Sequence, residues 1–370
     1  MPCICSRNWS VAGNFWQKHG VAGLCFRKKA CLVGRVKAFL LVLTAFFVPW
    51  SHALELVLPT ENTAIFRGGG PAFYMYVERN FEGQKSQPWE GGKYGFVRDP
   101  VRTPEGLVFK RLHEGLDIKP VRRDARGVPL DPVKAVARGE VVHVSDKSSA
   151  SNYGKFIVIQ HLWDGCLYYS LYAHLNHISV IPGESVAAGQ TIGVLGFTGR
   201  GINIIRAHLH FEINLLLSNR FEEWHVRNFQ GSPNVHGLFN GLNLSGFDPA
   251  AFLLQNKKDP SLSIPAFLAR QEVFYRIQVP APGPVDLVGR YPWMRDNYRA
   301  GQAAEISFLR SGLPVKVKGL NEAVSAPRVS WVKPVRAPLR YYTKNYINDT
   351  PSGPQIAESG LRFLELLGVQ

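Results

Sequence analysis

The sequence has little cysteine. It holds five in 370 residues, and four of them lie before residue 53. Cys166 alone lies in the rest of the chain, so a chain that loses its first 53 residues has no internal disulfide. Cys166 stands eight residues before His174, but nothing else in the sequence supports a thiol nucleophile. We therefore interpret Cys166 as a small apolar residue of the interior.

The main apolar run is too short to span a bilayer comfortably. AFLLVLTAFFVPW, residues 38–50, has 13 residues, whereas a spanning helix needs about 20. Residues 1–53 contain seven Lys or Arg and no acid, and Ser51 and Ala53 fit a small-x-small cleavage signal. We expect a signal peptide over residues 1–53, cut after Ala53. An uncleaved anchor is the alternative, and a start nearer Arg35 stays open because the basic leader is long.

Dense runs of Lys or Arg are also lacking. The formal net charge of +15 falls to +8 when residues 1–53 are removed. Nucleic-acid-binding proteins usually carry such runs or a strongly basic patch, so we expect no nucleic-acid partner. A modest positive charge suits a polyanionic surface such as a bacterial envelope.

No long window carries a helical period, and no internal repeat is evident. Gly (35) and Pro (25) are frequent, and β-branched or aromatic runs alternate with turn signals. We expect a mainly β protein with an antiparallel, sandwich-like domain. The expected division is a segment of short strands and turns over 54–90, that domain over 91–255, and an accessory carboxy-terminal region over 256–370.

Two of the expected strands carry histidines in alternation. In HLHFEI, residues 208–213, period two places His208, His210 and Glu212 on one face and the apolar residues on the other. In YSLYAHLNH the same period places Tyr172 and His174 on a shared face. We interpret Glu212 as an ordinary charge of the sheet face, with a supporting role to an imidazole as the alternative.

A third segment adds a carboxylate. In RLHEGLDIKP an extended chain projects His113, Gly115 and Asp117 to one face, and Gly115 would leave room for an ion. A helix would also bring positions four apart together, so the spacing alone does not decide. Pairing the three segments in one sheet gathers four histidines and one aspartate. Catalytic zinc uses three such ligands and leaves a position open to water, and two further imidazoles could transfer protons and stabilise an oxyanion.

HEGLD, YAHL and HLHFEI, in this order, resemble the three signatures of the LytM and lysostaphin-type zinc endopeptidases, which cut peptide cross-links in peptidoglycan. The resemblance covers residues 92 to 252. It implies an antiparallel β-sandwich-like fold with the site in a groove. It also implies that His113, Asp117 and His210 bind Zn²⁺, and that His174 and His208 are catalytic imidazoles.

Two stretches depart from that family pattern. RGINIIRA, before His208, is longer and bulkier than the usual glycine-rich link, and KPVRRDARGVPLDP, after HEGLDI, also looks extended. We expect both near the groove, where they would affect substrate preference. VIPGESVAAGQTIGVL is similar to the hairpin of biotinyl and lipoyl carriers, but no lysine lies between Lys155 and Lys257, which excludes that function. We interpret the remaining histidines as structural: His143, His161, His177, His225 and His236.

These residues favour an exported zinc metalloendopeptidase of the periplasm or cell envelope that hydrolyses peptide stems of peptidoglycan, with no stable membrane span after signal cleavage. The alternatives are a non-enzymatic activator or binding module of other wall hydrolases, and a zinc peptidase that acts on proteins.

Overall fold

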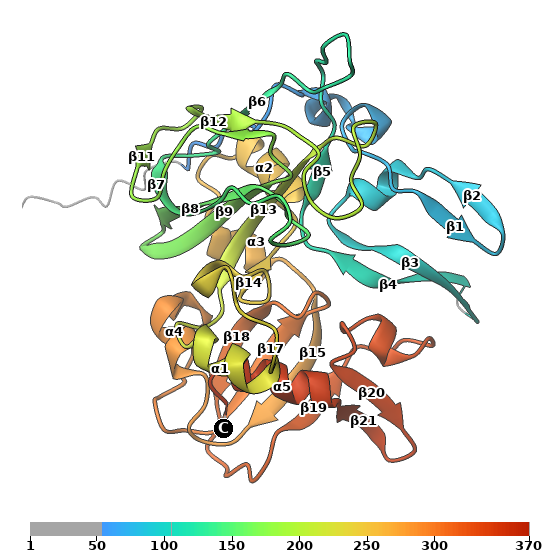
Figure 1. Cartoon of the computed structure of the whole chain (residues 1–370). Coiled ribbons are helices and arrows are strands. Elements are labelled where there is room, and N and C mark those ends of the chain that lie inside the picture. The colour runs from blue at the N-terminus through green and yellow to red at the C-terminus, as the bar shows by residue number, and fades with distance from the viewer. Residues whose placement is uncertain (1–53, 105, 370) are drawn as a thin grey trace, which may run out of the picture. The chain divides into compact units, whose positions relative to one another are not determined.

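The computed structural model describes residues 54–104 and 106–369 (Figure 1). The expected signal peptide, residues 1–53, lies outside the described residues. Within the described ranges, no helix combines the length and the apolar character needed to cross a bilayer.

The largest sheet has seven strands, and every pairing in it is antiparallel. Its order is β11-β7-β8-β9-β13-β14, and β5 also pairs with β13. The strands are β5 (Leu116–Ile118), β7 (Gly139–Ser145), β8 (Phe156–Trp163), β9 (Cys166–Ala173), β11 (Ser185–Val186), β13 (Leu209–Leu216) and β14 (Leu244–Gly246). The expectation of a mainly β, antiparallel architecture is confirmed.

The alternation in HLHFEI explains how β13 packs. Leu209, Phe211 and Ile213 are fully buried in the main hydrophobic core. A three-stranded sheet, β10 (His177–Ile178), β12 (Thr191–Val194) and β6 (Pro132–Lys134), contributes Val133 and Ile192 to the same core. The opposite face of the large sheet is covered by a second apolar cluster that includes Leu171 and Ala173. Both faces of β13 are therefore buried.

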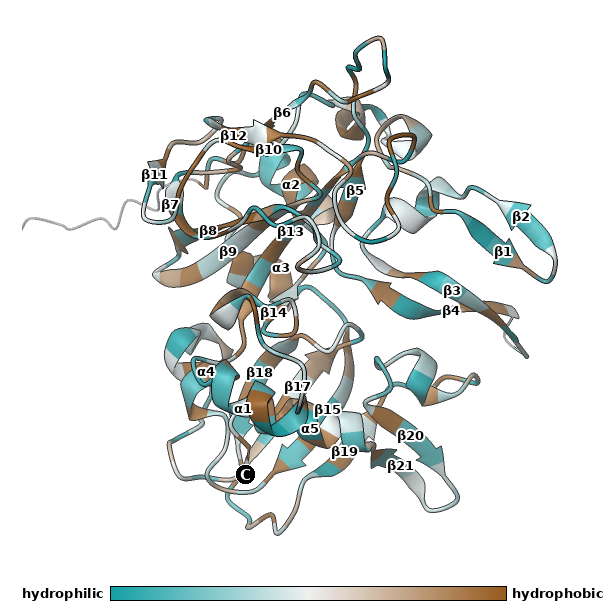
Figure 2. Ribbon diagram, in the orientation of Figure 1, coloured by the Kyte–Doolittle hydropathy of each residue, from teal (hydrophilic) through white to brown (hydrophobic). Residues whose placement is uncertain are grey.

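Residues 54–90 contribute to the core. They form the short 3-10 helices η1 (Ala64–Arg67), η2 (Gly70–Ala72) and η3 (Trp89–Gly92) and the hairpin β1 (Arg79–Phe81) with β2 (Gln84–Ser86). The hairpin is hydrophilic in Figure 2. Phe73 is fully buried, and the Met75 N–H donates to the Asp117 carbonyl at 2.8 Å. Residues 73–75 therefore pack beside β5, where Tyr74 forms an isolated bridge with Ile118.

A longer hairpin, β3 (Gly95–Thr103) with β4 (Gly106–His113), leads into β5. Helices α1 (Phe221–Asn228) and α2 (Pro249–Lys258) follow β13 and β14. The Asp248 carboxylate caps α2 by accepting from two backbone N–H groups, at 2.9 and 3.1 Å.

The carboxy-terminal residues build a second sheet of five strands, in the order β16-β18-β17-β15-β19. Its strands are β15 (Val273–Val279), β16 (Arg295–Asp296), β17 (Ala304–Leu309), β18 (Pro314–Gly319) and β19 (Arg328–Val332). The other elements are α3 (Ile264–Ala269), α4 (Val285–Arg290), η5 (Pro292–Met294), η6 (Leu339–Tyr341), β20 (Ile347–Thr350), β21 (Gly353–Ile356) and α5 (Glu358–Leu366).

This second sheet shares its core with the first. Tyr291 is fully buried, and its hydroxyl accepts from the Leu216 N–H at 2.8 Å and donates to the Leu167 carbonyl at 3.0 Å. The Trp224 indole of α1 donates to the Arg362 carbonyl of α5 at 2.8 Å. The boundaries at 90 and 255 remain predictions.

Candidate metal centre

Three side chains from β4, β5 and β13 converge on one point. His113 ends β4, and His210 of β13 lies directly opposite Asp117 of β5 in the ladder. Asp117 Oδ1 lies 3.0 Å from His113 Nε2 and 3.0 Å from His210 Nδ1, and the two nitrogens are 3.1 Å apart. Tetrahedral zinc with bonds of about 2.0–2.1 Å separates its ligands by about 3.3 Å. The donor set therefore fits this metal.

The outer nitrogen of each imidazole is held by an acceptor. His113 Nδ1 lies 2.8 Å from the Lys93 carbonyl, and His210 Nε2 lies 2.7 Å from Glu212 Oε1. If each outer nitrogen donates its proton, His113 Nε2 and His210 Nδ1 both present lone pairs to Asp117. Three acceptors facing one point repel one another unless a cation or proton lies between them.

The surroundings shift the pKa values of these groups in opposite directions. Burial lowers the pKa of His113 despite nearby Asp117. Burial also disfavours charge on His210, but hydrogen bonds to Asp117 and Glu212 outweigh it and raise its pKa to about 9. For Asp117, burial is outweighed by His113, His208 and Arg98, which hold its pKa well below its usual range. The carboxylate is ionised at neutral pH.

Arg98 fixes the orientation of Asp117. Its Nη2 lies 2.6 Å from Asp117 Oδ2, while its Nε donates to the Gly91 carbonyl at 3.1 Å. One carboxylate oxygen is thus bound by the guanidinium, and Oδ1 faces the histidines. Arg98 comes from β3, so the β3–β4 hairpin supplies this contact.

His174 and His208 lie beside the three converging groups. Their ring centroids are 4.8 Å apart, and that of His174 is 5.8 Å from His210. His174 Nδ1 lies 2.9 Å from the Thr198 carbonyl, and His208 Nδ1 lies 2.6 Å from the Arg206 carbonyl. The Nε2 atom of each ring therefore points away from the backbone. That of His208 is 3.3 Å from Asp117 Oδ1.

The expected shared face of Tyr172 and His174 is wrong. β9 ends at Ala173, which pairs with His210, whereas Tyr172 pairs with Phe211 on the core face. A straight strand would therefore turn His174 into the core. His174 instead adopts a left-handed backbone conformation, with φ of 65°, which is uncommon for a residue with a Cβ. This turn brings the imidazole to the site.

His113 and Asp117 lie in strands and not in one helix, but the segment is not extended throughout, because Glu114 and Gly115 separate β4 from β5. Gly115 does not make room for an ion. A Cβ there would lie 2.5 Å from the Phe211 carbonyl oxygen and 3.0 Å from His210 Cε1, closer than real contacts allow. Glycine is required because β13 passes directly beside it.

Glu212 is not the ordinary charge of an exposed sheet face that the sequence suggests. Its side chain is only 1% exposed, and besides contacting His210 it accepts from the Tyr153 hydroxyl and from Asn214 Nδ2, both at 2.8 Å. Strand parity does place Glu212 and Asn214 on the histidine face. No local pattern points to Tyr153 or Arg98, because both approach from distant parts of the chain.

The five residues open onto a groove with a volume of about 820 Å³. Arg200, Gly201, Ile202 and Arg206, from the long link before His208, line it. The other extended stretch contacts that link, since Arg123 donates to the Ile204 carbonyl at 2.7 Å. Two histidines interpreted as structural, His225 and His236, also line the groove. No residue of the described segment 54–90 does.

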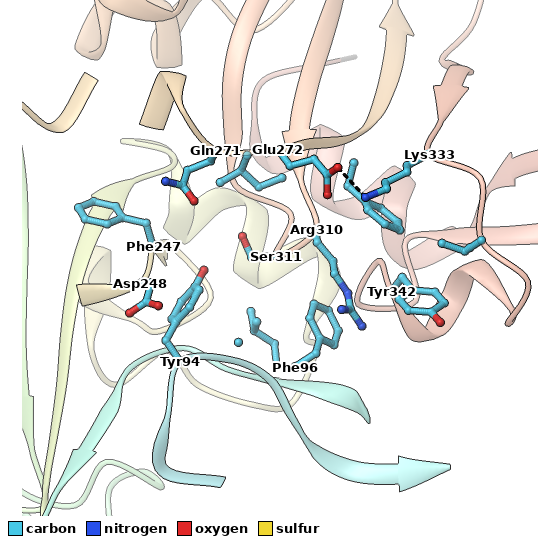
Figure 3. A pocket seen from close by; sticks show the side chains of 15 residues that line it. Tyr94, Phe96, Phe247, Asp248, Gln271, Glu272, Arg310, Ser311, Lys333 and Tyr342 are labelled. Carbon is cyan, nitrogen blue, oxygen red and sulfur yellow. Dashed lines mark hydrogen bonds and ion pairs between the residues drawn. The ribbon is translucent and has the colours of Figure 1, made fainter. Parts of the chain in front are cut away.

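A second cavity, of about 520 Å³, lies between the β3–β4 hairpin and the carboxy-terminal sheet (Figure 3). Arg310 stacks there with Phe96 and Tyr342, at 4.4 Å from each ring, and Glu272 pairs with Lys333. No imidazole lines this cavity, so it lacks the metal-ligand chemistry of the groove.

Comparison with known proteins identifies the family. The family model described as "Peptidase family M23" matches residues 111–221, the stretch that holds all five site residues. Lipoprotein NlpD of Yersinia enterocolitica is 37% identical over 90 residues, which cover 24% of this chain and 84% of that protein. The chain belongs to peptidase family M23.

Two relatives of this M23 chain carry an activity in their names. Peptidoglycan DD-endopeptidase ShyC of Vibrio cholerae is 32% identical over 155 residues, covering 40% of this chain and 34% of that protein. Peptidoglycan DD-endopeptidase ShyA of the same organism is 40% identical over 109 residues, covering 29% of this chain and 21% of that protein. The M23 chain therefore spans about a third or less of these two relatives.

Proposed function

We propose that this M23 chain is a zinc metalloendopeptidase that hydrolyses peptide cross-links of bacterial peptidoglycan. The observation that carries the proposal is the convergence of His113 Nε2, Asp117 Oδ1 and His210 Nδ1 within 3.0–3.1 Å of one another. These three residues are buried and form a group able to hold a metal ion.

His113, Asp117 and His210 would hold zinc. The distances favour His210 over His208 as the third ligand, since His208 Nε2 lies 3.3 Å from Asp117 Oδ1 and His210 Nδ1 lies 3.0 Å from it. Bound zinc would lower the pKa of water and polarise a peptide carbonyl. Arg98 would keep one oxygen of Asp117 directed at the site, and Glu212 would keep His210 in the tautomer that offers Nδ1.

His174 and His208 would move protons and stabilise charge. Each is held through Nδ1 by a backbone carbonyl, so Nε2 can accept a proton from the attacking water or donate one to the departing amine. Burial is the main reason why the pKa of His174 lies well below its usual range, and the neighbouring His208 and His210 lower it further. A neutral His174 at pH 7 suits the role of general base.

The substrate class rests on the relatives and on the groove. ShyC and ShyA are named as peptidoglycan DD-endopeptidases. The groove is large enough for an extended peptide stem, and all five site residues line it. The chain would act outside the cytoplasm, in the periplasm or cell envelope, as the expected signal peptide requires.

The main rival is a non-enzymatic binding module that activates other wall hydrolases. Such a protein has no need of an intact ligand set, whereas this chain keeps all five residues in contact. The other rival is a zinc peptidase directed at proteins, which shares the same centre and differs only in what the groove accepts.

Purified sacculi provide the test. The zinc-loaded protein is incubated with sacculi, and the soluble fragments are separated by liquid chromatography and weighed by mass spectrometry. We expect cross-linked dimers to become monomers, and we expect His210→Ala or a chelator to abolish the change. Intact cross-links after prolonged incubation with the zinc-loaded protein would contradict the proposal, and cleavage of casein alone would favour the protein-directed rival.

A further inference from the structure

The groove carries a surplus of positive charge. Apart from histidines, its charged lining consists of four arginines and two acids. Several of these are already paired: Arg98 with Asp117, Arg111 with Asp99, and Glu114 with Lys344. Across the described ranges, no carboxylate lies within ion-pair distance of Arg200 or Arg206. Both arginines belong to the link that is longer and bulkier than the family pattern.

Arg206 has an unmet hydrogen-bonding requirement. Its Nε is buried and has no partner among the described residues. A buried donor of a charged group destabilises the protein unless an acceptor meets it. Because Arg206 lines the groove, a molecule bound there can offer acceptors to its guanidinium.

The backbone around Arg206 is fixed. Its N–H donates to Asn203 Oδ1 at 3.0 Å, and its carbonyl accepts from His208 Nδ1 at 2.6 Å. Arg123 binds the two preceding carbonyls, of Ile204 at 2.7 Å and of Ile205 at 3.3 Å. The backbone of Arg206 is therefore held two residues before a site imidazole, so little backbone entropy is lost when its side chain binds a ligand.

We propose that Arg206 binds a carboxylate of the substrate peptide beside the scissile bond, with the exposed Arg200 as a second cation. This inference rests on the endopeptidase function proposed above. It adds that the groove selects peptides with a carboxylate beside the scissile bond. A guanidinium presents a planar fork that matches a carboxylate with two hydrogen bonds. The long link would then be a specificity element.

The test uses one synthetic cross-linked peptide dimer in two forms, with free carboxylates and with the same groups as amides. Binding is measured by fluorescence anisotropy in the His174→Ala background, where the labelled dimer stays intact, and cleavage is measured in the otherwise unmodified protein. Arg206→Gln removes the charge and Arg206→Lys keeps it. Arg126→Gln is the matched control, because Arg126 lies on the adjoining loop, is 86% exposed and does not line the groove.

We expect Arg206→Gln to weaken binding of the acid form by at least about tenfold and to leave the amide form unchanged. KM for the acid form rises while kcat stays within about twofold, Arg206→Lys is intermediate, and Arg126→Gln behaves like the parent. Equal binding of both forms by the parent, or an unchanged acid-to-amide ratio in Arg206→Gln, overturns the inference even if cleavage is intact. Binding that depends on Arg206 without any cleavage supports the inference and contradicts the proposed hydrolase.

Discussion

The contact between Glu212 and His210 leads to a quantitative prediction about zinc affinity. Glu212 is 1% exposed, and its Oε1 accepts from His210 Nε2 at 2.7 Å. Burial disfavours its charge, but His210, Asn214 and Tyr153 outweigh burial and lower the pKa of Glu212, so it is a carboxylate at neutral pH. That charge makes His210 Nδ1 more basic and hence a better ligand for a cation.

Glu212→Gln keeps the shape of the side chain and removes its charge. Both oxygens of Glu212 accept hydrogen bonds in the parent protein. Whichever of these two positions the amide nitrogen of the glutamine takes, it therefore faces another hydrogen-bond donor. Loss of such a supporting contact weakens metal affinity by about 10–100-fold, or about 1.4–2.7 kcal/mol. We expect the Kd for zinc to rise by this factor.

Competition with a chromophoric chelator at pH 7.5 measures the Kd, and thermal unfolding of the apo protein checks that the variant folds. Glu114→Gln is the matched control, because Glu114 lines the same groove but is 42% exposed and contacts Lys344 at 3.7 Å. We expect its Kd to change by less than about threefold, since the contact is solvent-screened. Equal affinities for Glu212→Gln and the parent would refute the reasoning, as would equal losses in both variants.

Three further predictions concern the imidazoles and the packing. His174→Ala and His208→Ala should each retain about one zinc per chain by metal analysis yet cleave sacculi about 10²–10⁴-fold more slowly; loss of zinc would make either one a ligand. Burial lowers the pKa of His161 from an ordinary 6.5 to about 4. Between these two pH values the unfolded chain binds a proton that the folded protein does not bind. The free energy of unfolding therefore falls as pH drops from 6.5 towards 4, by about 2 kcal/mol at pH 5. Urea midpoints at pH 7 and pH 5 should show a shallower loss for His161→Gln, and an unchanged loss would contradict this. Tyr291→Phe leaves the Leu216 N–H without its 2.8 Å partner and should destabilise the protein by about 1–3 kcal/mol in urea, with zinc affinity unchanged.

Sequence patterns predicted the parts of the site that depend on strand periodicity. Alternation in HLHFEI placed Leu209 and Phe211 in the core and His210 and Glu212 on the other face, as the ladder shows. The same rule failed at His174, because one left-handed residue reverses the direction of the side chain. Period two describes a straight strand and contains no information about where the strand ends.

Sequence patterns could not predict the contacts between segments that lie far apart in the chain. The Arg98–Asp117 pair depends on the register of the β3–β4 hairpin, which includes a shift between Phe96 and Arg98. Burial of Glu212 depends on Tyr153, which arrives from the loop before β8. Such contacts follow from tertiary packing, which short-range propensity does not encode.

Titration of the apo protein with zinc, with cleavage of purified sacculi followed at each step, tests the central claim most directly. If His113, Asp117 and His210 hold one catalytic zinc, cleavage rises in proportion to added metal and stops rising at one equivalent per chain. Full cleavage by the metal-free protein would contradict the account.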